Sequence, residues 1–310
     1  MEGTLRSVGD CLYTYTRPLT GYGGFVTGSL LVLPGSALVV DTLCSPRDME
    51  AFIPLIGERP VTVVYTHADW DHCLGTGGLN PVRVIAHELT GKRLSERGDD
   101  MLAEIERDNP DLVSDASIVL PGTTFQDGLT FELMSGPSSS RDGGDLNERD
   151  REDNDRDDCV SGGPHGSDKV VVELVHLPGH TEDSTVCWIP QLGVLIAGDV
   201  VEDPFPSVSE PLHTGLWADG LEQWERSAST VIPGHGAVSG PELLARNVRY
   251  LRGLMGAARR NTPYPWLTPD VSLEYLDPKT AQIVSKMPAS EQAFYRDVHK
   301  ENVRRVISVL

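Results

Sequence analysis

The sequence lacks the features that mark several large classes of protein. Its five cysteines are an odd number and form no C-x-x-C pair, which argues against a disulfide framework or a zinc ribbon. No run of about 18 apolar residues suggests a membrane span. The opening segment, MEGTLRSVGDC, lacks the basic and then apolar pattern of a signal peptide. We therefore expect reduced thiols, a cytoplasmic location and no membrane partner.

Basic residues are scarce, with 26 Lys and Arg against 46 Asp and Glu, and the formal net charge is −20. A surface of this sign repels phosphate backbones, so a nucleic-acid partner is not expected. A small anionic substrate remains compatible with the charge, because bound cations dominate the field in their own pocket. The chain also has no G-x-S-x-G nucleophile elbow, so nothing indicates a serine hydrolase.

The chain is long enough for one large α/β domain with an appendage. We assign residues 1–260 to that domain and residues 261–310 to a proline-containing linker and a helical C-terminal extension, whose helices are candidates for a homo-oligomer contact. Residues 136–168 contain no aromatic residue and many acidic ones, so we expect a disordered acidic insert. Apolar runs predict strands elsewhere, among them a pair within residues 25–43 that turns at Pro34-Gly35 and one at residues 117–120.

Residues 61–72, VTVVYTHADWDH, concentrate metal-binding side chains at the end of one predicted strand. The β-branched run at 61–66 ends where His67, Asp69, Asp71 and His72 begin. Alternate residues of a strand point the same way, so His67 and Asp69 would face together, with the other two in the following turn. A solvated polar loop is the alternative.

Three later segments, VVVELVHLPGHT, LGVLIAGDV and STVIPGHG, repeat this pattern. His180 and His235 each follow a short apolar strand in a P-G-H turn, and Asp199 follows the run 194–198. Strand ends bring side chains together at a cleft, so the pattern predicts an assembled metal site. His87 is instead expected to cap a helix or lie on the surface, and His299 to be an exposed helix residue.

These motifs resemble the metallo-β-lactamase fold superfamily over roughly residues 20–258. Its first motif, H-x-H-x-D-H, is followed by an isolated His, an Asp and a final His, each at a strand end. This chain has H-A-D-W-D-H, then His180, Asp199 and His235 in that order, and it departs from the pattern at Asp69, where most members have histidine. The resemblance implies an α/β fold, a four-layer αββα sandwich of two mixed sheets with the site at one edge.

The resemblance also implies two divalent metal ions, with zinc favoured and iron or manganese as alternatives, because carboxylate suits harder ions. It would divide the ligands as follows: His67, Asp69 and His180 on one ion; Asp71, His72 and His235 on the other; Asp199 between them. Asp71 would be the catalytic residue that orients the attacking water. Asp41 would support the centre, although a turn-capping role is an equal alternative.

The function implied is a metal-dependent hydrolase that uses a metal-activated bridging hydroxide on a small ester, thioester, lactone or phosphodiester. One alternative is a diiron oxidoreductase, because flavodiiron members also carry a carboxylate in place of the second histidine, although theirs is Glu. The other alternative is a non-catalytic metal-binding protein. It is disfavoured because every metal position holds a competent ligand.

Overall fold

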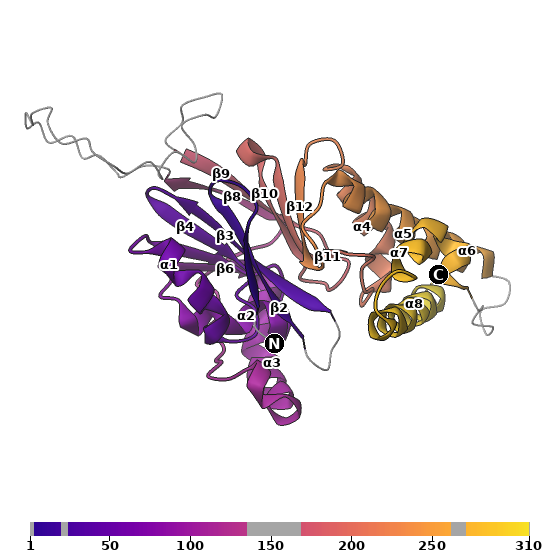
Figure 1. The fold of residues 1–310 in the computed structure, drawn as a ribbon, viewed down its shortest axis with the longest axis horizontal. Coiled ribbons are helices and arrows are strands. Elements are labelled where there is room, and N and C mark those ends of the chain that lie inside the picture. Colours follow the sequence, from indigo (N-terminus) through magenta and orange to yellow (C-terminus); the bar gives the residue numbers. More distant parts are fainter. Residues whose placement is uncertain (1–2, 20–23, 135–168, 262–270, 310) are drawn as a thin grey trace, which may run out of the picture.

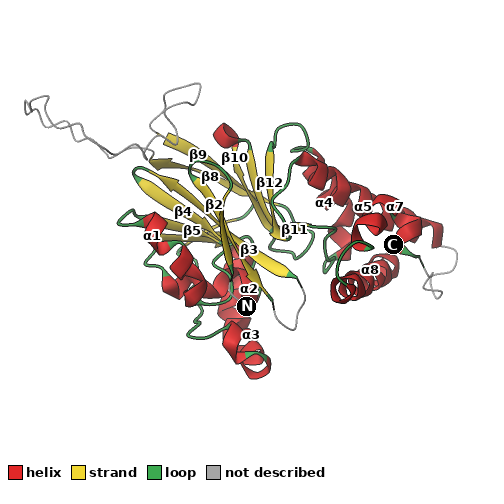
Figure 2. Ribbon diagram, in the orientation of Figure 1, coloured by secondary structure: helices red, strands yellow, loops and turns green. Residues whose placement is uncertain are grey.

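The computed structural model describes residues 3–19, 24–134, 169–261 and 271–309. The expected acidic insert and most of the expected linker lie outside these ranges. The described chain forms two groups of strands with helices beside them, and the C-terminal helices lie next to α4 (Thr214–Glu222) and α5 (Pro241–Asn261) (Figures 1 and 2).

The first half-sheet is mixed. Its strands are β1 (Thr4–Ser7), β2 (Leu12–Pro18), β3 (Phe25–Leu33), β4 (Ser36–Val40), β5 (Val61–Val64), β6 (Arg83–His87) and β7 (Thr123–Phe125). Neighbours are antiparallel from β1 to β4 and parallel from β4 to β7. The turn at Pro34-Gly35 confirms the expected strand pair. The strand expected at residues 117–120 is wrong: pairing with β6 begins only at Thr123, after Pro121, which has no N–H to donate.

The second half-sheet contains β8 (Gly128–Met134), β9 (Lys169–His176), β10 (Thr185–Ile189), β11 (Val194–Glu202) and β12 (Thr230–His235). Strands β8 to β11 are antiparallel neighbours, whereas β11 and β12 run parallel. The two halves are joined by the antiparallel pairing of β12 with β3, where His235 lies opposite Val26. We call this junction the seam, and it brings the end of β12 beside β3.

Three apolar clusters define the layers. The inner cluster joins the facing surfaces of the half-sheets, with Leu38 and Ile85 from the first and Val172 from the second. A second cluster packs the first half-sheet against α3 (Glu88–Asp108), which contributes Leu94. A third packs the other half-sheet against α4 (Thr214–Glu222) and α5 (Pro241–Asn261). This is the expected four-layer αββα sandwich.

The C-terminal extension adds to the outer layer beside α5. It comprises α6 (Leu273–Leu276), α7 (Pro278–Val284) and α8 (Ala289–Val309). Val303 and Val306 of α8 belong to the same buried cluster as Leu251 of α5. The expectation that His299 is exposed is wrong, because α8 docks on α5 and leaves its ring 3% exposed.

Two exclusions drawn from the sequence can be compared with the described residues. In those ranges every helix is too short or too polar to cross a membrane. Cys44, Cys73 and Cys187 are buried free thiols, as expected for a chain without a disulfide framework.

Candidate metal centre

The site lies at the seam, where strand ends of both halves meet. His67 follows β5, and the short helix α2 (Trp70–Cys73) carries Asp71 and His72, with Asp69 at its N-terminal boundary. His180 lies in the turn after β9, Asp199 lies in β11 and His235 ends β12. The structure therefore brings all seven predicted ligand residues to one place.

A glycine precedes each of the two histidines in P-G-H because the backbone passes too close to other groups for a side chain. A Cβ on Gly234 would lie 1.9 Å from Oδ1 of Asp199, and one on Gly179 would lie 2.3 Å from the ring of Trp217. These two approaches fix how near His180 and His235 come to the rest of the site.

Asp199 occupies the centre of the cluster. Its Oδ2 lies 3.1 Å from Nε2 of His235 and 3.5 Å from Nε2 of His180, and its Oδ1 lies 3.2 Å from Nε2 of His72. Nε2 of His67 is 3.7 Å from the same carboxylate. Asp199 thus contacts all four imidazoles, as a bridging ligand would.

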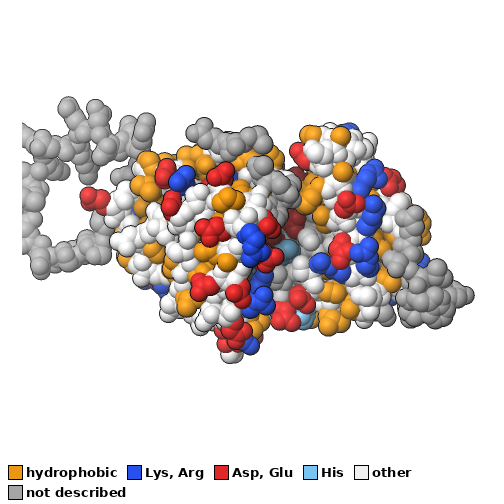
Figure 3. All heavy atoms as spheres, turned by 90° about the horizontal axis from the view of Figure 1, so that it is seen from below, with side chains coloured by type: hydrophobic (Ala, Val, Ile, Leu, Met, Phe, Trp, Pro, Cys, Tyr) orange, Lys and Arg blue, Asp and Glu red, His pale blue; other side chains and the backbone are white. Residues whose placement is uncertain are grey.

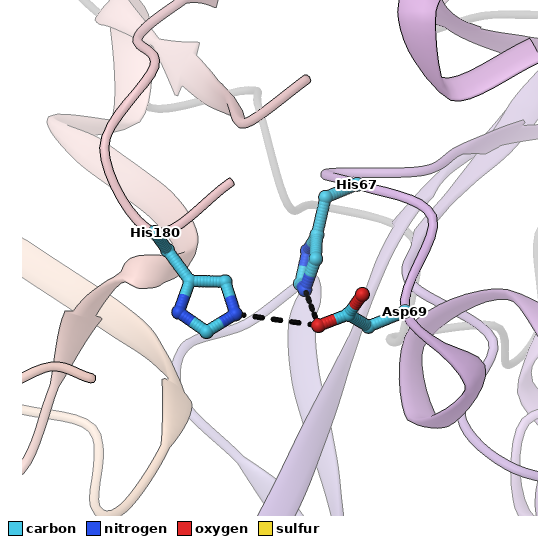
Figure 4. A group of neighbouring side chains, drawn as sticks. All are labelled: His67, Asp69 and His180. Atoms are coloured by element: carbon cyan, nitrogen blue, oxygen red, sulfur yellow. Dashed lines mark hydrogen bonds and ion pairs between the residues drawn. The ribbon is translucent and has the colours of Figure 1, made fainter. Parts of the chain in front are cut away.

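The other two aspartates sit on either side of Asp199. Oδ2 of Asp69 lies 3.3 Å from Nε2 of His180 and 3.5 Å from Nε2 of His67, and Figure 4 shows both rings pointing at this carboxylate. Oδ2 of Asp71 lies 3.6 Å from Nε2 of His235. Four groups of these side chains could each hold a metal ion. Two have the composition that the resemblance implies, namely His67, Asp69 and His180, and Asp71, His72 and His235; the others are His67, His72 and Asp199, and His180, Asp199 and Glu202.

Each imidazole is held from behind through Nδ1. His72 donates to Oδ2 of Asp41 at 2.8 Å, His180 to the carbonyl of Ser207 at 3.1 Å, and His235 to the carbonyl of Phe25 at 2.9 Å; Nδ1 of His67 lies 3.0 Å from Oγ1 of Thr66. A proton placed on Nδ1 leaves Nε2 free to act as a ligand. The four rings are therefore oriented, with the correct nitrogen facing inwards, before any metal arrives.

Asp41 does more than cap a turn. Its carboxylate accepts hydrogen bonds from the Thr66 N–H and Oγ1, each at 2.8 Å, in addition to that from His72. The side chain is 1% exposed. Asp41 thus fixes both a ligand ring and the chain that leads into His67.

Three atoms at the centre of the site are buried without a hydrogen-bond partner among the described residues: Nε2 of His67, Nε2 of His72 and Oδ1 of Asp199. The last two lie 3.2 Å apart but are not aligned for a hydrogen bond. Such atoms are costly to bury and rare in folded proteins. A divalent cation would satisfy all three. Imidazole and carboxylate are also the donor types that zinc, iron and manganese accept, so the residues fit the ions that this fold implies.

The electrostatics of the cluster have the same cause throughout. Burial raises the pKa of the Asp199 carboxyl, but His235 and His72 outweigh it and hold the pKa well below its usual range. Burial lowers the pKa of His235, but Asp199 outweighs it and raises the pKa to about 9. In the absence of cations, the negative charge of the carboxylates favours protonated imidazole rings. Bound divalent ions would supply the positive charge instead.

Two residues at the site escaped the sequence reasoning. Glu202 is 7% exposed and lies beside His180 and Asp199, and burial followed by Asp199 raises its pKa to about 7. Three residues of regular strand would put Glu202 and Asp199 on opposite faces, but the register of β11 shifts between Gly198 and Glu202 and turns Glu202 inwards.

Arg93 is the second residue that was missed. From α3 its guanidinium donates a hydrogen bond to Oδ1 of Asp69, the position that departs from the motif. In the sequence, an arginine on the polar face of a helix is expected to be exposed to solvent, so nothing linked Arg93 to the site. His87, at the start of the same helix, caps it by accepting from the Leu89 N–H, as expected, but it is buried rather than on the surface.

The family model of the metallo-beta-lactamase superfamily matches residues 21–235. The chain belongs to this superfamily. Its members are mostly metal-dependent hydrolases, and the fold generally binds divalent metals. Among curated proteins the comparison finds no match.

Solved structures of the superfamily share the fold. A metallo-beta-lactamase from Pontibacter korlensis is 19% identical, with a TM-score of 0.55 over 81% of this chain and 99% of that one. The DIM-1 metallo-beta-lactamase is 21% identical, with a TM-score of 0.52 over 79% and 94% of the two chains. An enzyme from Erythrobacter litoralis is 18% identical, with a TM-score of 0.53 over 81% and 96%. Identities this low establish the fold and leave the substrate of this chain open.

Proposed function

We propose that this chain is a dinuclear metal-dependent hydrolase of a small ester, thioester, lactone or phosphodiester. The observation that carries the proposal is the set of buried, unpartnered atoms, Nε2 of His67, Nε2 of His72 and Oδ1 of Asp199, inside a cluster of ligand-type side chains. When bound, two divalent ions supply Lewis acidity and lower the pKa of a water molecule held between them.

The residues take the roles that their contacts support. The ligands are His67, Asp69 and His180 on one side, Asp71, His72 and His235 on the other, and Asp199 in the middle. Asp71 is the proposed catalytic residue: its Oδ2 lies 3.6 Å from Nε2 of His235 and its Oδ1 3.9 Å from Nε2 of His72, so the carboxylate lies between two ligand rings, where it would orient a water and accept its proton. Figure 3 shows histidine beside acidic side chains on one face of the molecule.

Arg93 supports zinc as the metal. Relative to a histidine, Asp69 adds one negative charge to the site, and the guanidinium of Arg93 adds one positive charge beside it. The net charge near the ions is thus the same as with the usual histidine.

A diiron oxidoreductase is the second candidate, favoured by the carboxylates of Asp69 and the additional buried Glu202. Iron accepts oxygen ligands more readily than zinc does. Iron in protein purified without added metal, together with oxygen consumption in the presence of a reductant, would support this candidate over the hydrolase.

Elemental analysis combined with a substrate panel tests the main proposal. We expect about two zinc ions per chain and hydrolysis of one class in a panel of esters, thioesters, lactones, phosphodiesters and, given the titles of the similar structures, β-lactams. Asp71→Asn should abolish turnover while the chain stays folded, whereas Asp219→Asn, at an exposed carboxylate, should change nothing. Reconstituted protein that holds less than one metal per chain and hydrolyses nothing would refute the proposal.

A further inference from the structure

The segment that follows β11 carries one of the groups that orient the site. The carbonyl oxygen of Ser207 accepts the hydrogen bond from Nδ1 of His180 at 3.1 Å, and the N–H of the same residue donates to Oε1 of Glu202 at 2.8 Å. Both peptide groups of Ser207 therefore face the cluster. The position of its carbonyl sets the direction in which Nε2 of His180 points.

Asn302 of α8 forms hydrogen bonds with the backbone on both sides of Ser207. Its Oδ1 accepts from the Val208 N–H at 2.8 Å, and its Nδ2 donates to the Pro206 carbonyl at 2.8 Å. The side chain is 1% exposed. The Val208 N–H and the Ser207 carbonyl belong to one peptide unit, and the Pro206 carbonyl and the Ser207 N–H belong to the preceding one. An amide that pairs with Val208 and Pro206 therefore fixes both units, and with them the direction of the Ser207 carbonyl.

The orientation of the amide is itself determined. Nδ2 of Asn302 also donates to the hydroxyl of Tyr250 at 3.1 Å; that hydroxyl donates to Nδ1 of His299 at 3.0 Å, whose Nε2 donates to the Val271 carbonyl at 2.8 Å. A flipped amide would set its NH2 group against the Val208 N–H. The position therefore requires a donor and an acceptor on one side chain, as asparagine supplies.

Helix α5 holds Glu202, the residue that accepts from the Ser207 N–H, through a buried asparagine in the same way. Asn247 accepts from the Glu202 N–H at 3.0 Å and donates to the Glu202 carbonyl at 2.9 Å, and it is fully buried. Asparagine is unfavourable in the interior of a helix, and a buried amide costs free energy unless its donor and acceptor groups are hydrogen-bonded. Two such residues aimed at adjacent parts of one segment indicate that the segment must be held in one conformation.

We propose that Asn302 is a positioning residue of the metal centre, which acts from outside the region matched by the family model by holding Ser207 against His180. The proposal rests on the proposed function in that the cluster is taken to bind metal. Loss of a group that holds a metal-ligating histidine lowers metal affinity by about 10- to 100-fold. Because Asn302 acts through Ser207, we expect the low end, about tenfold.

The test compares Asn302→Leu and Asn302→Asp with Val306→Ala. Leucine keeps the size and removes all three hydrogen bonds of the amide, and aspartate keeps the acceptor but sets an oxygen against the Pro206 carbonyl. Val306 is a fully buried apolar residue of the same helix, so Val306→Ala weakens the docking of α8 without touching the amide. Each variant is measured at temperatures where circular dichroism shows it folded.

Three readouts are taken: the dissociation constant for Zn²⁺ by chelator competition, the visible spectrum of the Co²⁺-loaded protein, and, in metal-free protein, the ¹⁵N shifts of the His180 ring. We expect both Asn302 variants to raise the dissociation constant about tenfold, alter the Co²⁺ bands and shift the Nδ1 resonance of His180, because the hydrogen bond from Nδ1–H to the Ser207 carbonyl weakens. Val306→Ala should lower the melting temperature and leave all three readouts unchanged.

Unaltered Zn²⁺ affinity and an unaltered His180 Nδ1 resonance in both Asn302 variants would overturn the proposal, as would an equal effect of Val306→Ala. Wild-type protein that binds no divalent ion would refute the proposed function instead. In that case the His180 shifts of the metal-free protein still decide whether Asn302 positions the ring.

Discussion

Asp41 offers a direct test of how far the metal centre depends on residues that touch no metal. Its backbone φ is 62°, in the left-handed region that asparagine tolerates, so Asp41→Asn leaves the backbone unstrained. The carboxylate accepts three hydrogen bonds, two from Thr66 and one from His72. An asparagine has one oxygen, so its NH2 group must face at least one of these donors.

The size of the effect follows from this mismatch. A hydrogen bond to a charged group contributes about 1.5–3 kcal/mol, and the lost charge also weakens the bond from His72. We expect Asp41→Asn to lower the free energy of unfolding by about that amount and Zn²⁺ affinity by 10- to 100-fold, which is about 1.4–2.8 kcal/mol.

Asp277→Asn is a matched control, because Asp277 is also 1% exposed and accepts from the N–H and the hydroxyl of one threonine, Thr280, and from Arg249. It lies at the start of α7, away from the candidate ligands. Chemical denaturation gives the stability of both variants, and chelator competition gives their affinity. If both lose stability equally and both keep wild-type Zn²⁺ affinity, Asp41 does not orient His72 for the metal and the reasoning fails.

Three further changes test other parts of the structure. Gly234→Ala sets a Cβ 1.9 Å from Oδ1 of Asp199, so we expect a loss of about 1–3 kcal/mol in denaturation and of bound metal; unchanged metal content would contradict the close approach. Arg93→Leu leaves the charge of Asp69 uncompensated and should shift the Zn²⁺ to Mn²⁺ affinity ratio roughly tenfold towards Mn²⁺, and adding Asp69→His should reverse that shift in the same assay. Burial lowers the pKa of His299, so the unfolded chain binds its proton more readily; stability is complete above about pH 6.5 and falls as the pH drops towards the lower folded pKa. Urea unfolding of metal-free protein should show this acid loss in the wild type and a smaller one in His299→Gln, and equal pH dependence of the two would show that His299 does not contribute.

The metal-ligand cluster was within reach of the sequence because its signals are local. His67, His180, Asp199 and His235 each follow an apolar strand at a turn, and a strand end fixes where the next side chain points. The layer order came from the family resemblance, which depends on the same motifs. The roles of the seven residues remain predictions, while the structure brings the side chains together.

What the sequence did not indicate depends on long-range packing or on irregular backbone. Glu202 faces the site only because β11 shifts register, and alternation predicts the opposite face. Arg93 reaches Asp69 from a helix whose position depends on the first half-sheet. Asn302 and His299 lie on a helix that reads as amphipathic but whose docking partner, α5, no local pattern identifies. The error at residues 117–120 has a smaller cause, since an apolar run was assigned as a strand although no neighbouring strand pairs with it.

The seam has a consequence for the order in which the chain acquires its parts. The hydrogen bond between His235 and the Phe25 carbonyl spans 210 residues. At synthesis rates of about 5–20 residues per second, roughly 10–40 s pass between the appearance of its two ends. Until β8 to β11 emerge, the inner face of the first half-sheet has no partner, and the ligands His67, Asp69, Asp71 and His72 are present without those from the second half. A nascent chain can therefore complete the metal site only after residue 235 has emerged. The apolar face that stays exposed until β8 to β11 appear makes that earlier interval the period of greatest risk of aggregation.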